Sequence, residues 1–287
     1  MTKPDMRAAS RGFTLIEILV GMVIFAIVGA LFTGLLSSQG RFFDKQGMSN
    51  AARNVSRGAL NRVVSDFRMV ETSGGMIAAS PTSVTLRLPF AIGVVCSSTE
   101  SSTAISMLPV DSVIYHAEGF YGYAWRSATT GEYTYVENPA ARDKTTGSNA
   151  CNAVAITTLP EGRAARITPV VSGSSLGTPV FLYRRIRYEF KASAAVPGKI
   201  GLWRTTIFQN GSEKAEELVA PFASSARFRF FVVGNNSDAQ DAPPGDLRTV
   251  RGLELHLDGA SEVIAAGESS VETALFTTAV FFKNRTN

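Results

Sequence analysis

The chain contains little of what common catalytic centres require. It has only two histidines, His116 and His256, and neither has a cysteine, aspartate or glutamate at the spacing of a metal site. Both are expected on strands, as surface or edge residues. No G-x-S-x-G, Walker or G-x-G-x-x-G pattern is present, and GFYGYAW at residues 119–125 is typical of an aromatic strand with a glycine break. We therefore expect a protein that is not an enzyme and needs no cofactor.

Net charge is also small. The 287 residues carry a formal charge of +4. Lys3, Asp5, Arg7 and Arg11 supply +2 of it, three positive charges less one negative, so the remainder of the chain is near +2. Such an excess argues against a nucleic-acid partner. The length leaves room for one large or two small globular parts.

One stretch is too apolar for a soluble domain. From Phe13 to Leu36 the side chains are aliphatic, aromatic or small apart from Thr14, Glu17 and Thr33. As a helix rising about 1.5 Å per residue, this stretch is long enough to cross a hydrocarbon core of about 30 Å. An ionised Glu17 inside it would cost roughly 2.5 to 3.5 kcal/mol, so we expect the carboxylate to have a compensating partner.

The residues at the start of this stretch resemble the type IV prepilin signal. In RGFTLIEILV, residues 11–20, a basic residue, a glycine, a phenylalanine and a glutamate four residues further on occur together. The resemblance implies that prepilin peptidase cuts between Gly12 and Phe13 and methylates the new terminus of Phe13. It also implies that Glu17 pairs with the terminal amine of a neighbouring subunit when helices pack into a filament. A carboxylate facing an ammonium would offset its burial.

Two other interpretations of the N-terminus compete with this one. A secretory signal peptide would use Lys3, Arg7 and Arg11 as its basic region, but its apolar core is usually about 7 to 15 residues long and ends at a small-x-small cleavage site. A plain signal anchor explains the length and the positive flank but not Glu17. The prepilin signal predicts a single-pass protein of the inner membrane with its head in the periplasm.

This topology would place Cys96 and Cys151 outside the cytoplasm, where a disulfide persists. A bridge between them would close a loop of about 56 residues, which stabilises a fold by roughly 4 kcal/mol in the chain-entropy model. The alternative is two free, buried thiols. We expect the bridge.

Beyond Leu36, apolar residues recur at steps of three and four, which predicts an amphipathic helix. Arginines lie on or beside its opposite face, so this helix is expected to dock on a globular head and to end at residues 72–75. The apolar positions are Ala52, Val55, Ala59, Leu60, Val63, Val64, Phe67 and Val70, and the arginines are Arg53, Arg57, Arg62 and Arg68.

After Gly75, short β-branched and aromatic runs separated by turn residues predict a β-rich head, and hence an α+β fold with a long N-terminal helix. Alternation supports several strands; Leu253, Leu255 and Leu257, for example, share one face. Expected strands cover residues 84–88, 112–117, 121–125, 153–158, 166–171, 180–190, 201–208, 226–233, 250–257 and 271–283.

The order of motifs in residues 180–285 is similar to the heads of larger minor pilins, the PilW- and PulJ-like pseudopilins. The motifs are YEF, GLWR, a glutamate-rich turn into LVAPFASSARFRFFV, VRGLELHL and a last strand ending in FFKNR. Together with the N-terminal patterns, they predict a leader at residues 1–12, a transmembrane or filament-core helix at 13–36 and a docking helix at 37–73. The head should cover residues 76–287, with a loop-rich insertion at about 89–179.

Two ligand sites are weaker hypotheses. Asp238, Asp241 and Asp246 offer the hard oxygen atoms that calcium prefers, but they lack EF-hand spacing and are also typical of a surface turn. Residues 183, 185 and 187 on one strand face, Tyr183, Arg185 and Arg187, could stack bases and hold phosphates of a nucleic-acid strand. The alternative is a solvated strand face.

The sequence thus predicts a minor pilin or pseudopilin that packs into a type IV pilus or a type II secretion pseudopilus. A large head suits a subunit that initiates or caps assembly. Expected partners are prepilin peptidase, other subunits and the inner membrane. The alternatives are an adhesin or DNA-uptake receptor on the same scaffold, or a membrane-anchored hydrolase.

Overall fold

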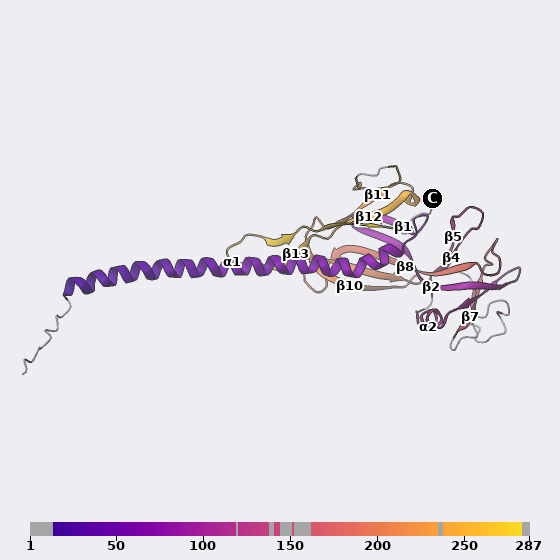
Figure 1. The fold of residues 1–287 in the computed structure, drawn as a ribbon, viewed down its shortest axis with the longest axis horizontal. Coiled ribbons are helices and arrows are strands. Elements are labelled where there is room, and N and C mark those ends of the chain that lie inside the picture. The colour runs from indigo at the N-terminus through magenta and orange to yellow at the C-terminus, as the bar shows by residue number, and fades with distance from the viewer. Residues whose placement is uncertain are drawn as a thin grey trace, which may run out of the picture.

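The computed structural model describes residues 14–118, 120–137, 141–143, 151, 162–234 and 238–282. A single helix, α1 (Leu15–Met69), extends far beyond the rest of the molecule (Figure 1). Gly40 and Gly47 lie inside this helix without interrupting it. It ends where Val70 takes an extended conformation and donates its N–H to the Phe67 carbonyl, slightly before the expected stop at residues 72–75.

The head is built on one large antiparallel sheet. In the described part of the chain this sheet has twelve strands, whose main path runs β14-β13-β10-β9-β8-β2-β3-β7-β6. Strand β1 also pairs with β2, and β4 pairs with β8 and β5. The strands are β1 (Met76–Ser80), β2 (Ser83–Ser98), β3 (Thr103–Met107), β4 (Gly122–Arg126), β5 (Tyr133–Glu137), β6 (Ala141–Asp143), β7 (Arg163–Thr168), β8 (Pro179–Ala192), β9 (Ile200–Ile207), β10 (Glu213–Phe222), β13 (Gly259–Ile264) and β14 (Val271–Ala274).

A second, three-stranded sheet is formed by β11 (Arg227–Val232), β12 (Val250–His256) and β15 (Thr277–Phe281). A short 3₁₀ helix, η3 (Leu247–Thr249), leads into β12. The alternating residues Leu253 and Leu255 are fully buried, as are Phe228 and Phe230 opposite them. This sheet therefore covers the main core with one apolar face.

The long strands β2 and β8 run through two separate cores. They pair from Ser83 opposite Glu189 to Val94 opposite Pro179. Towards one end, Val84, Leu86, Ile186 and Tyr188 pack with α1 and the small sheet in the first core. Towards the other end, the same two strands contribute to a second core, which contains Ala91, Val95, Ile105, Tyr115, Tyr123, Trp125, Ile167, Val180 and Leu182. One β-ladder, with a register shift between Pro89 and Ala91, thus connects the two halves of the head.

The predicted α+β class, a long N-terminal helix with a β-rich head, is confirmed. Some local expectations were wrong. Residues 112–117, expected as a strand, lie in helix α2 (Pro109–Glu118). Proline is favoured in the first turn of a helix, an acidic residue there interacts well with the helix dipole, and this turn contains Asp111. These signals outweighed the short β-branched and aromatic run at residues 113–115 on which the expected strand was based.

Other differences concern strand number. The glutamate-rich segment expected as a turn forms most of β10, and the long final strand is divided into β14 and β15. The described part of residues 89–179, expected as a loop-rich insertion, includes part of β2, all of β3, β4, β5, β6 and β7, and helix α2. The strand expected at 153–158 lies outside the described residues.

Candidate functional site

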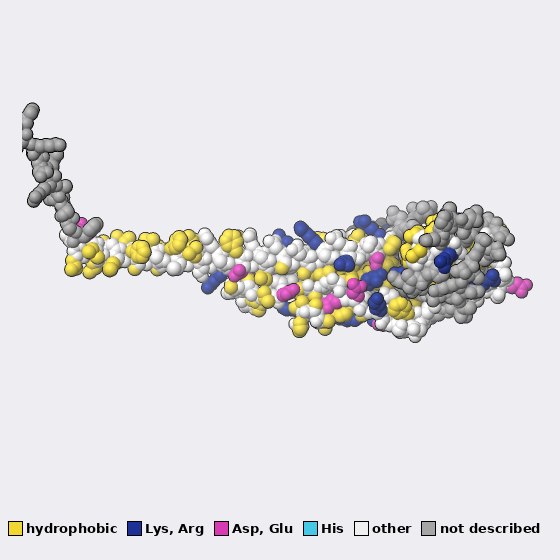
Figure 2. All heavy atoms as spheres, turned by 90° about the horizontal axis from the view of Figure 1, so that it is seen from below, with side chains coloured by type: hydrophobic (Ala, Val, Ile, Leu, Met, Phe, Trp, Pro, Cys, Tyr) yellow, Lys and Arg dark blue, Asp and Glu magenta, His cyan; other side chains and the backbone are white. Residues whose placement is uncertain are grey.

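The first half of α1 is an unpaired apolar shaft. Leu15 is 81% exposed and Phe25 is 80% exposed, and residues of every helix face between them are also exposed. The helix is long and apolar enough to cross a membrane, and none of its most apolar segment is buried within the chain. Figure 2 shows hydrophobic side chains gathered along this shaft, with white backbone and other side chains between them. Because so large an apolar surface marks a membrane or protein contact, the shaft is the candidate functional surface.

Glu17 lies in the first turn of this shaft and caps it. Its side chain accepts hydrogen bonds from the Thr14 backbone N–H and from Thr14 Oγ1, each at 2.9 Å and each to Oε2. In return, the Glu17 N–H donates to Thr14 Oγ1 at 3.3 Å. This reciprocal capping box satisfies N–H groups that have no partner within the helix. The carboxylate is therefore held at the helix end, beside the expected new terminus.

The second half of α1 docks on the head through small residues. Ala52, Ser56 and Ala59 are fully buried, and the larger Val63 and Phe67 complete the buried stripe. Ser56 Oγ accepts a hydrogen bond of 3.1 Å from the N–H of Gly259 on β13. The contact is so close because neither the helix nor the strand has a large side chain between the two backbones. The buried stripe begins at residue 52, and none of residues 37–51 of the expected docking helix is buried.

A polar cluster fixes the end of α1. The Tyr188 hydroxyl on β8 donates to Asp66 Oδ2, and Arg204 Nε on β9 lies 3.3 Å from the same oxygen atom. Arg204 Nε also contacts the Tyr188 hydroxyl at 3.2 Å. Burial, and then the Asp66 carboxylate, raise the pKa of Tyr188, so it remains a donor at neutral pH. One carboxylate thereby joins the helix to two strands.

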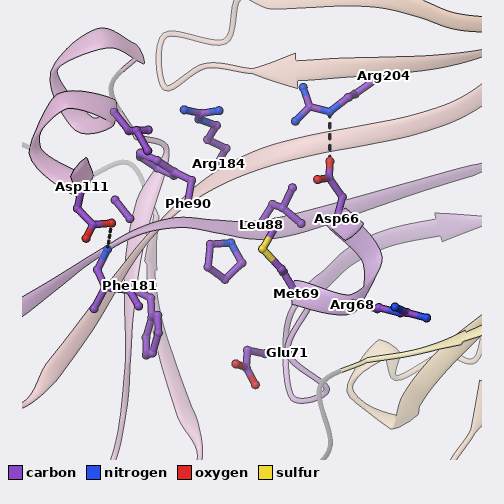
Figure 3. A pocket seen from close by; sticks show the side chains of 14 residues that line it. Asp66, Arg68, Met69, Glu71, Leu88, Phe90, Asp111, Phe181, Arg184 and Arg204 are labelled. Atoms are coloured by element: carbon purple, nitrogen blue, oxygen red, sulfur yellow. Dashed lines mark hydrogen bonds and ion pairs between the residues drawn. The ribbon is translucent and has the colours of Figure 1, made fainter. Parts of the chain in front are cut away.

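The Asp66 cluster borders a pocket of about 760 Å³ between the end of α1 and α2 (Figure 3). Across it, Asp111 of α2 accepts a hydrogen bond of 3.2 Å from the Ile92 N–H on β2. Arg184 lies over the Phe90 ring, 4.4 Å from its centre. Asp66, Asp111 and Arg184 therefore connect elements that surround this pocket.

A hairpin also reaches down the helix. Lys45 of α1 lies 2.9 Å from Glu268, in the turn between β13 and β14, and 3.6 Å from Glu272 of β14. Lys45 and Glu268 are exposed, so solvent screens these pairs and they add little stability. They do define where the head begins along the shaft.

Residues 7–33 match the family model of the prokaryotic N-terminal methylation motif. The chain is a type IV pilin-like protein with a prepilin signal. No curated protein and no solved structure matches it. The match includes Arg11, Glu17 and most of the apolar stretch, and it favours the prepilin signal over a secretory signal peptide or a plain anchor. Gly12 and Phe13, the expected processing residues of this pilin-like chain, lie outside the described residues.

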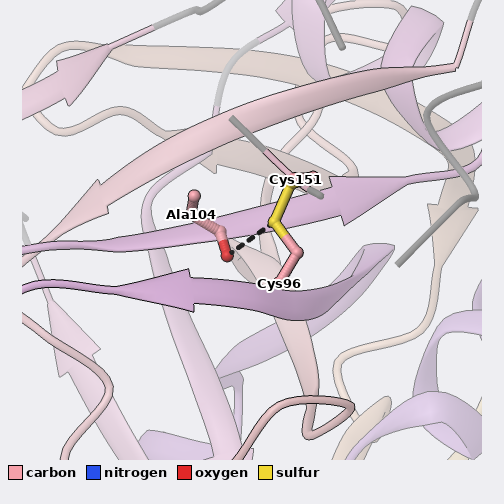
Figure 4. The surroundings of a disulfide bond; sticks show 3 residues. All are labelled: Cys96, Ala104 and Cys151. Carbon is pink, nitrogen blue, oxygen red and sulfur yellow. Dashed lines mark hydrogen bonds between the residues drawn. A yellow bond between two sulfur atoms is a disulfide. The ribbon is translucent and has the colours of Figure 1, made fainter. Parts of the chain in front are cut away.

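The predicted disulfide is present. Cys96 near the end of β2 is bonded to Cys151, with 5.0 Å between the Cα atoms (Figure 4). Both cysteines are buried and pack with Ala104 of β3 and Ala164 of β7. The bridge therefore joins the segment before β7 to the strand ladder of the second core.

The three aspartates proposed for calcium do not converge. Asp241 lies 2.9 Å from Arg229 and 3.3 Å from Arg227, both on β11. Asp246 caps η3 by accepting a hydrogen bond from the Arg248 N–H, and Asp238 is exposed. Among the described residues, no group of three or more potential metal ligands is found. Asp241 is thus paired with arginines and Asp246 caps a helix, which explains both side chains without a metal ion.

The proposed base-stacking face is occupied by internal contacts. Tyr183 is 1% exposed, and its hydroxyl donates to the Val136 carbonyl at 3.0 Å. Arg185 donates to the Tyr121 hydroxyl at 2.9 Å. Arg187 forms a bidentate ion pair with Glu213, with hydrogen bonds of 3.1 and 2.6 Å. A buried ring cannot stack on a base, so the hypothesis of a nucleic-acid site here loses its aromatic component.

His256 differs from its expected setting. It lies on β12 as predicted, but Nε2 is 2.7 Å from Glu254 Oε1, which also accepts a hydrogen bond from Arg229. Residues two apart on a strand share one face, so this neighbour was visible in the sequence. His116 lies in α2 rather than on a strand.

Sequence reasoning also missed Asp66 and Gly259 as docking residues. Asp66 is the sole acidic residue between positions 46 and 69 and directly precedes the apolar stripe residue Phe67. A single acid beside the buried stripe was the signal that could have predicted its role in docking. Nothing local indicated that Gly259 would contact the helix, because the two segments are about 200 residues apart.

Proposed function

We propose that this pilin-like chain is a minor pilin or pseudopilin. It is anchored in the inner membrane with its head in the periplasm, is processed by prepilin peptidase, and packs through α1 into a type IV pilus or a type II secretion pseudopilus. The observation that carries this proposal is the exposed apolar shaft on a helix whose start matches the methylation motif. Its role is assembly rather than catalysis.

The size of the head supports a low-copy position. In the described residues, the head has two large cores around a twelve-stranded sheet, so it is broad compared with the single helix that anchors it. Subunits packed side by side through α1 would bring such heads into conflict when many copies adjoin. A subunit at the tip, which initiates or caps the filament, does not have this constraint on its free side.

Glu17 would change partners on assembly. In the isolated chain it caps its own helix through Thr14. In the filament, its carboxylate would face the terminal amine of a neighbour in a low-dielectric setting. Loss of one member of a buried pair costs roughly 3 to 5 kcal/mol, which exceeds the roughly 2.5 to 3.5 kcal/mol gained by removing a charge from the membrane.

The test is therefore Glu17→Leu, with Thr33→Leu as its control. Thr33 lies on the same shaft and its hydroxyl only donates to the Ala30 carbonyl, so its loss removes a polar group without leaving an unpaired charge. We expect Glu17→Leu to be cleaved and membrane-bound but to co-purify poorly with partner subunits. Thr33→Leu should co-purify normally. Equal recovery of the Glu17 variant and the parent would contradict the proposed role of Glu17.

A further inference from the structure

One side of the docked half of α1 is positively charged. Arg53, Arg57 and Arg68 are all exposed. Their spacings of four and eleven residues are close to whole turns of an α-helix, so they lie along one side of it. We call these three residues the arginine stripe. Figure 2 shows basic side chains where the helix meets the head, beyond the hydrophobic shaft.

Nothing in the described part of the chain neutralises the arginine stripe. None of its members takes part in a hydrogen bond or ion pair among the described residues, whereas Arg87 and Arg229 pair with carboxylates of the head. The sole acid between positions 46 and 69, Asp66, is bound to Arg204 and Tyr188. Like charges four residues apart also disfavour a helix, so Arg53 and Arg57 do not serve local stability.

The membrane is too far away to be the partner. If the hydrocarbon core ends near Leu36, the helical rise places Arg53 roughly 25 Å and Arg68 roughly 48 Å above it. Exposed charges are screened over about 8 Å at physiological ionic strength. A lipid headgroup therefore cannot neutralise the stripe while the helix stands upright.

The other candidate partners are also poorly matched. A second copy facing this side would present the same three arginines, so symmetric self-pairing is repulsive. Single-stranded nucleic acid is typically bound by exposed rings beside the charges, but Phe67, which precedes Arg68 and is the one aromatic residue of α1 between residues 44 and 69, is buried. The chemistry that remains is a protein surface rich in aspartate and glutamate.

We propose that the arginine stripe docks on an acidic face of a different subunit standing beside this one in the same filament. This inference rests on the proposed function, because subunits anchored by the same N-terminal helix run parallel and present their heads and docked helices at similar heights. Opposite charges would then select the neighbour and exclude a second copy. The stripe would thus help to keep this chain at a single position.

The test uses the full-length chain in its own cells, with a photoactivatable benzophenone amino acid at Asn61. Asn61 is exposed and lies between Arg57 and Arg68. A second chain with the same group at Ile24, on the shaft, reports packing of the helices. We expect the Asn61 product, identified by mass spectrometry of linked peptides, to contain an Asp- or Glu-bearing segment of another prepilin-type subunit.

Charge reversal distinguishes electrostatic docking from proximity. The double variant Arg53→Glu, Arg57→Glu should lower the yield of the cross-linked product at Asn61 by roughly tenfold, as expected if the complex binds about tenfold more weakly. Reversing the linked acid of the partner should restore it. Lys214→Glu is the control, because Lys214 is exposed on β10 and forms no ion pair among the described residues. It should leave the yield unchanged.

The outcomes separate the two proposals. Products from Ile24 but not from Asn61 would overturn the docking inference and leave the filament role standing. Asn61 products with a second copy, lipid or nucleic acid, or a yield that charge reversal leaves unchanged, would also overturn the inference. If neither position gives a product with another prepilin-type subunit, both the inference and the filament role are contradicted.

Discussion

Gly259 of β13 lies so close to Ala52 of α1 that a Cβ atom on the glycine would be 2.0 Å from the Ala52 carbonyl oxygen. The same Cβ would be 2.8 Å from Ser56 Oγ. Backbone atoms cannot move aside as a flexible side chain can. The helix and the head are therefore held at a separation that only glycine permits.

Gly259→Ala should consequently weaken the docking of α1. Overpacking of a close contact typically costs roughly 1 to 3 kcal/mol. Thermal unfolding of the detergent-solubilised full-length chain should show a lower midpoint. Gly245→Ala is the control, since a Cβ there meets nothing within 4 Å. Equal unfolding midpoints for both variants would show that the helix and the strand can move apart without loss of stability.

Asp66→Asn should destabilise the same interface for a different reason. The half-buried Arg204 would lose its charged partner, and leaving a buried group unsatisfied costs roughly 1 to 3 kcal/mol. The matched control is Asp44→Asn, an exposed acid of the same helix with no ion pair in the described part of the chain. Limited proteolysis near residue 70 should accelerate for the Asp66 variant alone. Identical cleavage rates would remove Asp66 from the docking account.

Much of this architecture could be predicted from the sequence, because its signals are local. Steps of three and four residues identified the buried stripe of α1, and alternation identified β12. By contrast, the second core depends on pairing β2 with β8 and β3 with β7, strands far apart along the chain, and no local pattern specifies such partners. The Asp66 cluster likewise joins residues more than 120 positions apart.

The disulfide supplies a third prediction. Peptide mapping without reductant should recover Cys96 linked to Cys151. Replacing both by alanine should destabilise the second core by roughly 2 to 4 kcal/mol, because the cross-link restricts the unfolded chain. The helix–head interface lies in the other core and should be less affected. Alkylation of both thiols in protein isolated without reductant would contradict the bridge.

The fourth prediction concerns acid. Burial alone would raise the pKa of Glu254, but hydrogen bonds with His256 and Arg229 hold it below the ordinary value of 4.5. Glu254 therefore binds fewer protons in the folded chain than in the unfolded chain. Its contribution to stability is present above about pH 4.5 and is lost as the pH falls through the folded pKa.

Glu254→Gln should thus flatten the loss of stability on acidification below about pH 4.5. Denaturant unfolding followed at several pH values measures this slope. Glu100→Gln, at an exposed position, is the control and should retain the slope of the parent. An unchanged slope for Glu254→Gln would show that its ion pairs do not stabilise the fold.

The measurement that tests the assembly account most directly is the mass of the N-terminal peptide from chains recovered in the sheared-filament or secretion-pseudopilus fraction. The methylation motif at residues 7–33 predicts a terminus at N-methylated Phe13, present in that fraction and dependent on active prepilin peptidase. Recovery of the chain only in membranes, with its leader uncut or with a mature terminus elsewhere, would contradict the account.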